Sequence, residues 1–319
     1  MKVSILVPVY GVEKYIEECA VSLFEQTYDD IEYIFVDDCS PDHSIQVLEQ
    51  VLSRYPHRRS QVSIIHHQTN RGLGASRSTG LAAATGDYVM YVDSDDLIAT
   101  DTVEKLCRRQ QDTDADIVDC GFRRLLPDGT LGKSTLPGKE STELLLRMIL
   151  VQNTVSHNVW GRLIRRNLHT QYDIDFPEGV NMAEDYCSIS RLIFVARSRT
   201  FIGEALYLYR VNESGTFMSW ATERHMHSYL KAIHVVGAFL DEHDKTHTYS
   251  YSYELGMLNA RYHALGVLDE KKIEAICPYH PSHRLFRWCH VLLCHRFTRP
   301  LLRMTYLVVK RLYLKKLLS

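Results

Sequence analysis

The chain has 319 residues, of which 45% are hydrophobic and 24% are charged, and its formal net charge at pH 7 is −2. This is the composition of a globular protein with one large or two modest domains, and it excludes a disordered chain, a collagen and a multi-span membrane protein. The charge is unevenly distributed, because residues 281–319 contain nine Lys or Arg and no Asp or Glu, whereas the rest contains 28 basic and 39 acidic residues. A basic tail on an acidic body indicates an anionic partner, either a membrane surface or a nucleic acid.

The cysteines and the apolar runs indicate in which cellular compartment the protein is expected. The eight cysteines form no Cys-x-x-Cys pair, which favours reduced thiols in the cytosol over a disulfide framework. The apolar stretch at residues 3–9 is too short for a signal peptide and contains Pro8, so a first β-strand is the better interpretation. The sequence has no run of about 18 apolar residues, and we expect no transmembrane helix.

Strand and helix patterns alternate over the first 120 residues. Continuous apolar runs, typical of strands buried on both faces, alternate with segments whose apolar residues recur at helical spacing. Strands are expected at residues 3–9, 33–36, 62–66, 88–92 and 117–120, and helices at 13–27, 44–55, 76–84 and 102–111. This order predicts an α/β fold with a mostly parallel, doubly wound sheet and helices on both faces.

Beyond residue 120 the pattern is less regular. Pro127, Asp128 and Gly129 indicate a turn, interpreted as the tip of a hairpin. Residues 140–220 are mixed, and from residue 222 onward the pattern is mainly helical. We therefore expect a domain at 1–220, with halves at 1–120 and 121–220, and a helical C-terminal region at 221–319.

Polar side chains follow three of the predicted strands. They are Tyr10 after the first strand, Asp37 and Asp38 after the second, and Asp93, Asp95 and Asp96 after the fourth. The carboxyl ends of parallel strands share one edge of a sheet, where ligands of such folds bind, so these residues should meet there. Three carboxylates within four residues repel one another, and a divalent cation holding a diphosphate would stabilise them. The alternative is a solvated acidic turn that precedes the next helix.

Other kinds of site are absent from the sequence. It contains no phosphate-binding Gly-x-x-x-x-Gly-Lys-Ser/Thr loop, no His-Glu-x-x-His zinc motif and no Gly-x-Ser-x-Gly nucleophile turn. The segment at residues 72–74 lacks the third glycine of a dinucleotide-binding motif. The pattern therefore favours metal-assisted departure of a nucleoside diphosphate over covalent catalysis.

The order and spacing of these motifs resemble those of family 2 glycosyltransferases, which have the GT-A fold. The resemblance extends over residues 2–217, and the segments that carry it are 7–10, 22–28, 36–42, 70–81, 85–88, 92–96 and 184–185. Two residues depart from the family's pattern, which often has glycine at the position of Cys39 and asparagine at the position of Ser78. Neither position is expected to carry charge, so we expect only local effects.

The resemblance implies a UDP-sugar donor bound at the sheet edge. Tyr10 would lie against the base, Asp38 would accept a hydrogen bond from the uracil N–H, and Asp37 would frame the pocket. Pro8 would bend the strand end so that the base can enter. Arg77 would approach the diphosphate or brace the acidic cluster, and the alternative is a structural ion pair with Asp38 or Asp95.

The resemblance also implies a metal ion, Mn²⁺ or Mg²⁺, held by the segment from Asp93 to Asp96. Asp95 would coordinate the ion directly, Asp93 would touch the ribose or a metal-bound water, and Asp96 would support them. Ser94 belongs to the same donor-binding set. The ion would neutralise the charge that develops on the departing UDP.

On the acceptor side, the resemblance assigns the general base of an inverting transfer to Asp185. Glu184 would orient Asp185 or contact the acceptor, although an acidic pair at a helix N-terminus is the structural alternative. Trp160 would stack on a sugar ring or lie in the core. Arg210, together with residues 214–216, would belong to a loop that closes over the diphosphate.

The tail at residues 281–319 is imperfectly amphipathic. Leu301, Leu302, Val308, Val309 and Leu312 share one predicted helix face, Arg299, Arg303, Lys310 and Arg311 share the other, and Lys316 intrudes on the apolar side. We expect this segment to lie on an anionic membrane surface, the alternatives being a helix packed on the core or a dimer contact. It has no nucleic-acid motif, and no nucleic-acid partner is expected.

Together these features predict a cytoplasmic inverting glycosyltransferase, peripheral on the inner face of the plasma membrane. It would transfer a hexosyl or N-acetylhexosaminyl group from a UDP-sugar to a glycan or lipid-linked acceptor in cell-surface polysaccharide synthesis. The alternatives are a nucleotidyltransferase and an inactive nucleotide-sugar-binding protein. The lack of a glycine-rich, lysine-bearing loop between Val9 and Lys14 disfavours the first, and the presence of Asp95 and Asp185 disfavours the second.

Overall fold

The chain forms two compact units. The computed structural model describes residues 1–151, 157–212, 222–294 and 299–318. One unit, here called the α/β unit, comprises residues 1–139, 158–179 and 195–215, and the other, here called the helical unit, comprises 140–157, 180–194 and 216–319. This division differs from the boundary expected near residue 220, because the segments 140–157 and 180–194 cluster with the C-terminal helices.

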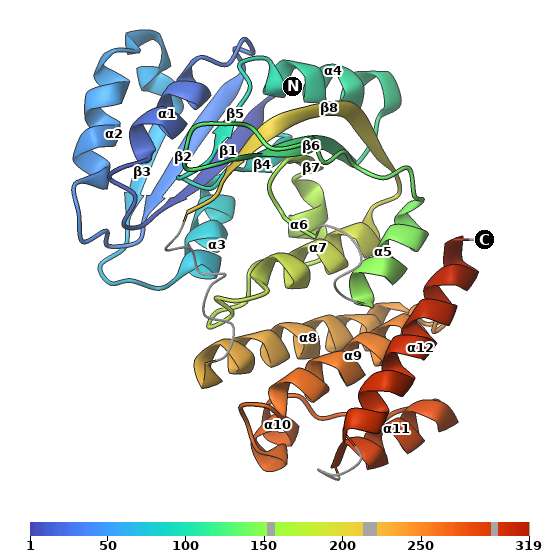
Figure 1. Cartoon of the computed structure of the whole chain (residues 1–319). Coiled ribbons are helices and arrows are strands. Elements are labelled where there is room, and N and C mark those ends of the chain that lie inside the picture. The colour runs from blue at the N-terminus through green and yellow to red at the C-terminus, as the bar shows by residue number, and fades with distance from the viewer. Residues whose placement is uncertain (152–156, 213–221, 295–298, 319) are drawn as a thin grey trace. The chain divides into compact units, whose positions relative to one another are not determined.

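An eight-stranded sheet runs through the α/β unit in the order β3-β2-β1-β4-β7-β6-β8-β5 (Figure 1). The strands are β1 (Val3–Val9), β2 (Ile31–Asp37), β3 (Val62–His66), β4 (Tyr88–Tyr91), β5 (Leu97–Ile98), β6 (Ile117–Leu125), β7 (Arg162–Arg165) and β8 (Arg199–Arg210). β1 pairs in parallel with both β2 and β4, and β2 pairs in parallel with β3. The predicted parallel half of the sheet is thereby confirmed.

The other half of the sheet is mixed. β7 runs antiparallel to β4 and to β6, β8 runs parallel to β6, and the short β5 runs antiparallel to β8. β8 has 12 residues and lies in the part of the sequence whose pattern was uninformative. Its C-terminal residues reach the loop that follows β4, because the hydroxyl of Tyr207 donates a 2.7 Å hydrogen bond to Asp96.

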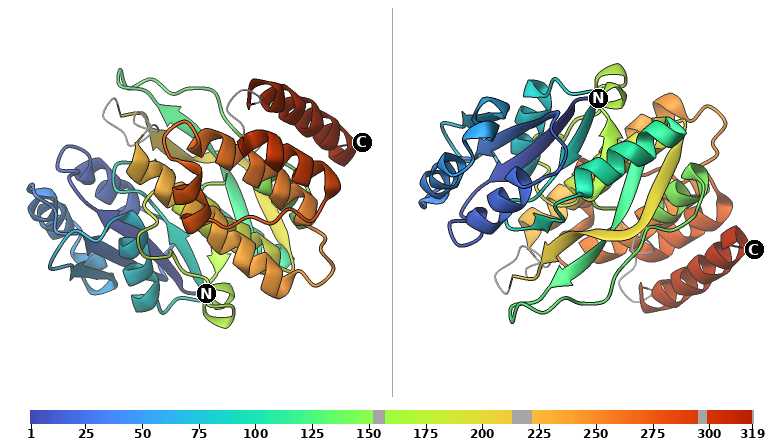
Figure 2. Two further views of the ribbon diagram at one scale, coloured as in Figure 1. Left: turned by 90° about the horizontal axis from the view of Figure 1, so that it is seen from below. Right: turned by 90° about the horizontal axis from the view of Figure 1, so that it is seen from above.

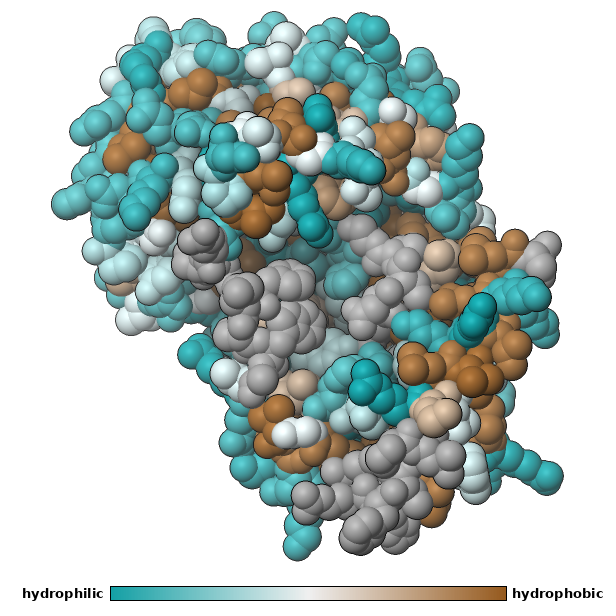
Figure 3. Space-filling model, viewed as in Figure 1, coloured by the Kyte–Doolittle hydropathy of each residue, from teal (hydrophilic) through white to brown (hydrophobic). Residues whose placement is uncertain are grey.

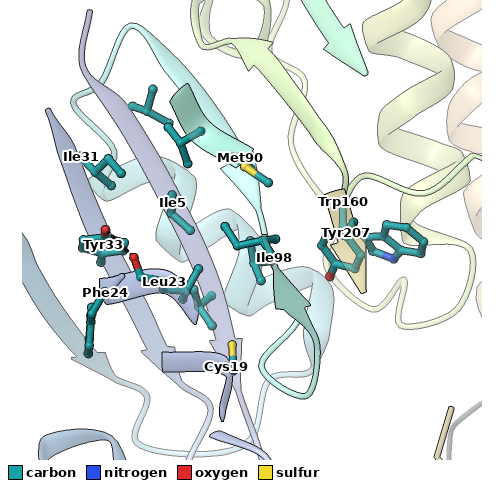
Figure 4. Close-up of a cluster of buried hydrophobic side chains, with 14 of the residues drawn as sticks. Ile5, Cys19, Leu23, Phe24, Ile31, Tyr33, Met90, Ile98, Trp160 and Tyr207 are labelled. Atoms are coloured by element: carbon teal, nitrogen blue, oxygen red, sulfur yellow. Dashed lines mark hydrogen bonds between the residues drawn. The ribbon is translucent and has the colours of Figure 1, made fainter. Parts of the chain in front are cut away.

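Helices cover both faces of the sheet. They are α1 (Ile16–Phe24), α2 (Ser44–Ser53), α3 (Leu73–Ala83), α4 (Thr102–Thr113) and the short α6 (Asn167–Gln171). Figure 1 shows α1 and α2 on one side of the sheet and α3 on the other. Side chains alternate between the faces of a strand. Accordingly Ile5 packs with Leu23 and Phe24 of α1 (Figure 4), whereas Leu6 lies against Gly80 of α3.

Two local features differ in detail from the sequence pattern. α3 begins at Leu73 rather than at residue 76, and Gly72 precedes it with a φ of +90° that favours glycine. The turn predicted at residues 127–129 is present, with Gly129 at a φ of +80°. The chain after this turn makes only isolated bridges to β6, such as that between Leu125 and Leu131, instead of a second hairpin strand.

The helical unit consists of helices throughout its regular structure. They are α5 (Thr142–Leu150), α7 (Glu184–Val195), α8 (Glu223–His243), α9 (Ser250–Ala264), α10 (Glu270–Ile276), α11 (Arg284–Cys294) and α12 (Arg299–Leu318). α8 and α9 lie side by side (Figure 2), and α9 also packs against α5, α11 and α12. The prediction of a mainly helical region after residue 222 is confirmed. None of the helices in the described ranges is both long and apolar enough to span a membrane.

The last helix, α12, packs against α9 and α11. Its contact with α9 includes Tyr313, whose hydroxyl lies 2.6 Å from the hydroxyl of Ser252. The exposed side combines apolar and basic residues, namely Arg303, Met304, Leu307, Val308, Arg311, Leu312, Lys315 and Lys316. Arg303 and Arg311 are thus exposed together with Val308 and Leu312, whereas Val309 and Lys310 are half-buried. Contact of this helix with a membrane stays a prediction. The side chains of Arg299, Leu301 and Leu302 lie outside the described part of the chain.

Candidate active site

Three strand ends meet at one edge of the α/β unit. Val9 at the end of β1 is in register with Asp37 at the end of β2, and the N–H of Asp38 donates to the carbonyl of Val9 over 2.9 Å. On the other side of β1, the N–H of Val92 donates to the carbonyl of Leu6 over 3.1 Å. Since β1 lies between β2 and β4, the residues that follow all three strands share this edge.

Pro8 lies within β1. The register between β1 and β2 is unbroken from Val3 to Val9. Pairing of β1 with β4 ends at Leu6. The carbonyl of Leu6 points toward β4, and residues two apart on a strand point their backbone groups to the same side. The nitrogen of Pro8 therefore also faces β4, beyond the last residue of β1 that pairs with it. The missing N–H therefore leaves no broken ladder bond, and it marks where β1 and β4 part.

The first part of the site is the surface around Tyr10, whose side chain is 50% exposed at the end of β1. Beside it, Asp37 accepts a 2.9 Å hydrogen bond from the N–H of Ser40 and lies 2.9 Å from His66 Nδ1. The N–H of Gly11 donates to Ser40 Oγ over 2.8 Å. These bonds tie the loop after β1 to the loop after β2 and leave the aromatic ring accessible.

Asp38 is buried and held by three neighbours. Its Oδ1 lies 2.7 Å from His67 Nδ1 and accepts a 2.8 Å bond from the N–H of Arg71, and its Oδ2 accepts a 2.7 Å bond from the N–H of Gly72. His67 is also buried, and its Nε2 lies 2.9 Å from the hydroxyl of Thr79 in α3. The carboxylate is therefore fixed in orientation, with Oδ2 the less engaged of its two oxygens.

Both departures from the family pattern have local structural explanations. Cys39 adopts a φ of +59°, a left-handed conformation that glycine adopts without strain, which is why glycine suits this position. Ser78 is smaller than the asparagine that the family often has here, and it still makes hydrogen bonds with the neighbouring backbone. Its hydroxyl accepts from the N–H of Phe176 and donates to the carbonyl of the same residue, each over 3.1 Å.

The second part of the site is the acidic loop at residues 93–96. Arg77 of α3 is 1% exposed, and its Nη2 lies 2.7 Å from Oδ1 of Asp93, which is 24% exposed. The guanidinium carbon also lies 5.6 Å from the centre of the Phe176 ring. Ser94 next to it is buried. The ion pair braces the acidic loop and offsets part of its negative charge, which is one of the arrangements expected for Arg77.

Asp95 lies between neighbouring negative charges. Its Oδ2 accepts a 2.6 Å hydrogen bond from the amide of Asn212, and its backbone carbonyl accepts a 2.8 Å bond from Nε of Arg210. Burial and, to a lesser extent, the charge of Asp93 raise the pKa of Asp95 to about 6, although Arg210 and Asn212 act in the opposite direction. Ionisation of Asp95 is thus less favourable than that of an aspartate in water, and a cation bound here would stabilise the ionised form.

Asp96 lies beneath the loop and is fully buried. Its Oδ2 accepts a 2.7 Å bond from the hydroxyl of Tyr207, and its Oδ1 accepts a 2.7 Å bond from the N–H of Arg210. Burial, followed by the charges of Asp93 and Asp95, raises its pKa well above the ordinary value. Both carboxylate oxygens are already used by the chain, so Asp96 connects the acidic loop to β8.

Trp160 belongs to the core of the α/β unit. Its ring stacks with Tyr207 at a centroid distance of 4.4 Å (Figure 4) and with Tyr209 at 5.5 Å, and it meets Phe122 edge-on. Only 9% of its surface is exposed. Of the two roles considered for Trp160, the structure therefore supports core packing, because its faces are occupied by other rings.

Arg210 is anchored at the end of β8. Its Nη2 lies 2.6 Å from Glu18, and its guanidinium carbon lies 5.2 Å from the centre of the Tyr15 ring. With its bonds to Asp95 and Asp96, Arg210 links α1 to the acidic loop. Residues 214–216, expected to form a closing loop with it, lie outside the described residues.

Glu184 and Asp185 begin α7 in the helical unit. Ala183, immediately before them, has a φ of +64°, a conformation that non-glycine residues rarely adopt. The preceding turn is held by Ser228 of α8, whose hydroxyl accepts 2.9 Å bonds from the N–H groups of Asn181 and Met182. Backbone strain of this kind is concentrated at functional sites in proteins.

The acidic loop provides oxygen donors of the kind that Mn²⁺ and Mg²⁺ bind. Within the part of the chain that the structure describes, no three His, Cys, Asp or Glu side chains are arranged as a complete metal site. Carboxylates of Asp93 and Asp95 at one loop fit an ion that completes its coordination with diphosphate oxygens and water. The residues present thus fit a divalent cation that is bound together with a nucleotide.

Sequence reasoning missed several positioning residues of this site. His67, the residue after the strand predicted at residues 62–66, contacts Asp38. Tyr207 contacts Asp96, and Asn212 contacts Asp95. Ser228 contacts the turn before α7. The bond between Tyr207 and Asp96 joins residues 111 apart in sequence, and no spacing rule predicts such a contact. Only the doublet of histidines after a predicted strand was a signal that could have been used.

Comparison with known proteins agrees with these observations. The sequence pattern of glycosyl transferase family 2 matches residues 4–169. EpsJ of Bacillus subtilis (strain 168), named as a glycosyltransferase, is 36% identical over 217 residues, which cover 66% of this chain and 61% of EpsJ. EpsH of the same organism, also named as a glycosyltransferase, is 32% identical over 289 residues, which cover 89% of this chain and 80% of EpsH.

The fold is similar to that of a solved structure from Staphylococcus aureus. Residues 1–349 of TarS, crystallised with UDP-GlcNAc, superpose with a TM-score of 0.63 at 23% identity, covering 99% of this chain and 92% of that one. At this identity the likeness shows a shared fold. With the matched family pattern, the strand-end motifs and the mixed sheet, it follows that the chain belongs to glycosyl transferase family 2 and has the GT-A fold.

Proposed function

We propose that this protein is an inverting glycosyltransferase that moves a sugar from a UDP-sugar to a glycan or lipid-linked acceptor. The observation that carries the proposal is the convergence of Tyr10, the Asp37–Asp38 pair and the acidic loop at one sheet edge. A base-binding surface and a diphosphate-binding acidic loop are thereby neighbours in one unit. TarS, which shares the fold, was crystallised with UDP-GlcNAc, and this supports the choice of a UDP-sugar.

The donor would be held by residues from two strand ends. The exposed ring of Tyr10 would pack against the uracil, and Asp38, through its less engaged Oδ2, would accept a hydrogen bond from the uracil N–H. Asp37 would frame this pocket. Pro8 would contribute by keeping β1 and β4 apart where the base enters.

A divalent cation, Mn²⁺ or Mg²⁺, would be held by Asp95 and Asp93 and would neutralise the charge that builds up on the departing diphosphate. Arg77 orients Asp93, and Asn212 orients Asp95, so both carboxylates are preorganised. Asp96 would support this loop through Tyr207 rather than bind the donor. Arg210 would fix the loop from the side of β8.

Asp185 would act as the general base. In a single displacement with inversion, a carboxylate on the face opposite the leaving group removes the proton of the acceptor hydroxyl as the new glycosidic bond forms. Glu184 would orient Asp185 or contact the acceptor. Asp185 lies in the first turn of α7 in the helical unit.

We further propose that the protein works in cell-surface polysaccharide synthesis, in the cytoplasm and peripheral on the inner face of the plasma membrane. The support is the uneven charge of the sequence, since residues 281–319 are basic without a single acidic residue. Exposed apolar side chains on the last helix add to it. An enzyme on the membrane surface would meet lipid-linked acceptors.

The test is incubation with a panel of UDP-sugars, Mn²⁺ and candidate acceptors, followed by analysis of the nucleotide released. Release of free UDP with transfer of the sugar is the expected result. Release of pyrophosphate would indicate a nucleotidyltransferase instead. Binding without any turnover, across the panel, would indicate a nucleotide-sugar-binding protein and would contradict the proposal.

The role of Asp185 is tested by the substitution Asp185→Asn. This change removes the base while keeping the size of the side chain, so transfer should fall by about 100-fold or more. Donor binding should stay within about twofold, because the proposed donor residues belong to the other unit. Turnover close to that of the unmodified protein would remove Asp185 from the mechanism.

A further inference from the structure

The C-terminal helices of the helical unit expose apolar side chains among basic ones. On α12 the apolar residues between 53% and 68% exposed are Met304, Leu307, Val308, Leu312 and Leu318. On α11 the exposed apolar residues are Leu285, Trp288 and Val291, with Arg284 and Arg287 exposed on the same helix. Figure 3 shows apolar side chains interspersed with hydrophilic ones along the C-terminal helix. Since residues 281–319 contain no Asp or Glu, this surface is positively charged.

A pocket of about 100 Å³ lies between α9 and α12 in this region. Its polar lining is Asn259, Tyr262 and His263 from α9 and Arg303 and Tyr306 from α12. The guanidinium carbon of Arg303 lies 6.0 Å from the centre of the Tyr262 ring. Among the described residues no carboxylate forms an ion pair with Arg303.

The lining of this pocket is suited to an anion. Arg303 supplies a planar set of N–H donors that matches phosphate oxygens, and the side chains of His263 and Tyr262 can each donate a further hydrogen bond. Burial, followed by the nearby charge of Arg303, lowers the pKa of His263, so its ring is a neutral donor at pH 7. A cation surrounded by donors and lacking an acidic partner is a binding site for a negatively charged group.

We propose that the pocket between α9 and α12 binds the phosphate group of an anionic phospholipid, with the adjacent apolar side chains of α12 inserted into the bilayer interface. Leu307 connects the two features, because it lines the pocket and is 53% exposed. Met304 and Val308 are exposed on the same helix within one turn of it. A lipid offers a phosphate and an acyl chain together, whereas a soluble phosphate would leave the apolar residues in water.

This inference rests on the membrane location proposed above and names the site that would produce it. It also predicts that the loss of vesicle affinity depends on which basic residue is changed. A diffuse basic surface would lose affinity about equally whichever charge is removed, by roughly fivefold for each. A specific phosphate pocket would lose more when Arg303 is changed, because direct charge-assisted hydrogen bonds are lost with the charge.

The experiment is flotation of the full-length chain with phosphatidylcholine vesicles, prepared with and without phosphatidylglycerol. The unmodified protein should float only with the vesicles that contain phosphatidylglycerol. Arg303→Gln should weaken this binding by roughly tenfold or more. The matched control is Lys315→Gln, which removes one exposed charge from the same helix about 18 Å away, and it should weaken binding by roughly fivefold.

A conservative variant, a folding control and competition with inorganic phosphate complete the experiment. Arg303→Lys keeps the charge but not the planar donor set, so its binding should fall between those of the unmodified protein and Arg303→Gln. Thermal unfolding should show that all the variants are folded. Inorganic phosphate, titrated against the protein and added to the flotation samples, distinguishes a free anion site from a lipid site. We expect it to bind far more weakly than vesicles and to compete poorly.

Three outcomes would overturn the proposal. They are flotation with pure phosphatidylcholine as strong as with phosphatidylglycerol, equal effects of Arg303→Gln and Lys315→Gln, and inorganic phosphate that binds through Arg303 without any vesicle binding. UDP titration on the same samples separates this proposal from the proposed reaction. A chain that binds UDP but not vesicles would refute the lipid site and leave the transferase proposal standing.

Discussion

The carboxylate of Asp38 illustrates how single residues prepare the donor site. Two backbone N–H groups and His67 hold it, and the histidine is itself fixed by Thr79 in α3. A rigid acceptor loses little conformational freedom when a ligand binds, so its preorganisation raises affinity. The neighbouring pair of His66 and Asp37 has similar chemistry but is solvated, because His66 is 55% exposed.

Replacing His67 by alanine should therefore weaken UDP binding. The change leaves Oδ1 of Asp38 with one partner fewer inside the protein and frees the carboxylate to rotate, and we expect about a fivefold to tenfold loss of affinity. His66→Ala is the matched control, since exposed pairs contribute little, and it should change affinity by less than about twofold. Isothermal titration with UDP measures both, and equal losses would contradict the positioning role of His67.

Asp95 shows the energetic cost of a buried acidic loop. Its pKa is raised to about 6 by burial and by Asp93, whereas an aspartate in the unfolded chain titrates near pH 4. Between these two values the folded protein binds more protons than the unfolded chain. The stability that comes from protonating Asp95 is thus fully present below about pH 4 and is lost as pH rises through about 6.

In the presence of EDTA, the unmodified protein should therefore lose stability relative to Asp95→Asn as the pH rises from 4 to 7. The difference should reach about 2 kcal/mol, from the size of the pKa shift. Thermal or denaturant unfolding of both proteins across this pH range isolates the contribution of Asp95, because other groups titrate in both. If the free energy of unfolding changed with pH in the same way for both proteins, ionisation of Asp95 would not destabilise the fold, which would contradict this prediction.

At the scale of elements, the start of α7 is a strained turn with a dedicated support. Ala183 has a positive φ directly before Glu184 and Asp185, and the turn before it is fixed by the hydroxyl of Ser228. A conformation of this kind costs about 1–2 kcal/mol and persists only when its surroundings determine it. The α8 helix thus helps to fix the position of Asp185 through this turn.

Ser228→Ala should lower kcat by about tenfold while leaving UDP affinity unchanged. Removing the hydroxyl leaves the N–H groups of Asn181 and Met182 without their partner, so the turn relaxes and Asp185 moves from its position. Ser252→Ala is the matched control. That serine is buried in the same unit and bonds to Tyr313, so its loss should reduce stability by a similar amount without affecting kcat. An equal loss of kcat in both variants would mean that general destabilisation is the cause.

At the scale of the molecule, the parallel half of the sheet could be predicted because its signals are local. Strands at residues 3–9 and 62–66 have the predicted bounds, since continuous apolar runs end at polar or turn residues there. The strands β7 and β8 of the mixed half could not be predicted. Their pairing partners are remote in sequence, and β8 alternates between buried and exposed residues without a clear period.

The same reasoning applies to the site. The residues at the strand ends could be placed together, because strand order alone brings them to one edge. Their partners could not, because contacts such as that of Tyr207 with Asp96 depend on the mixed half of the sheet. The role of Trp160 stayed open in the sequence and was decided by three aromatic neighbours.

The central claim is that the acidic loop binds a divalent ion together with a nucleoside diphosphate. The measurement that tests it most directly is calorimetric titration of UDP into the protein, with Mn²⁺ or with EDTA, for the unmodified chain and for Asp95→Asn. We predict that Mn²⁺ tightens UDP binding by about tenfold or more in the unmodified chain and has little effect in Asp95→Asn. Equal UDP affinity with Mn²⁺ and with EDTA, or an undiminished effect of Mn²⁺ in Asp95→Asn, would contradict the account.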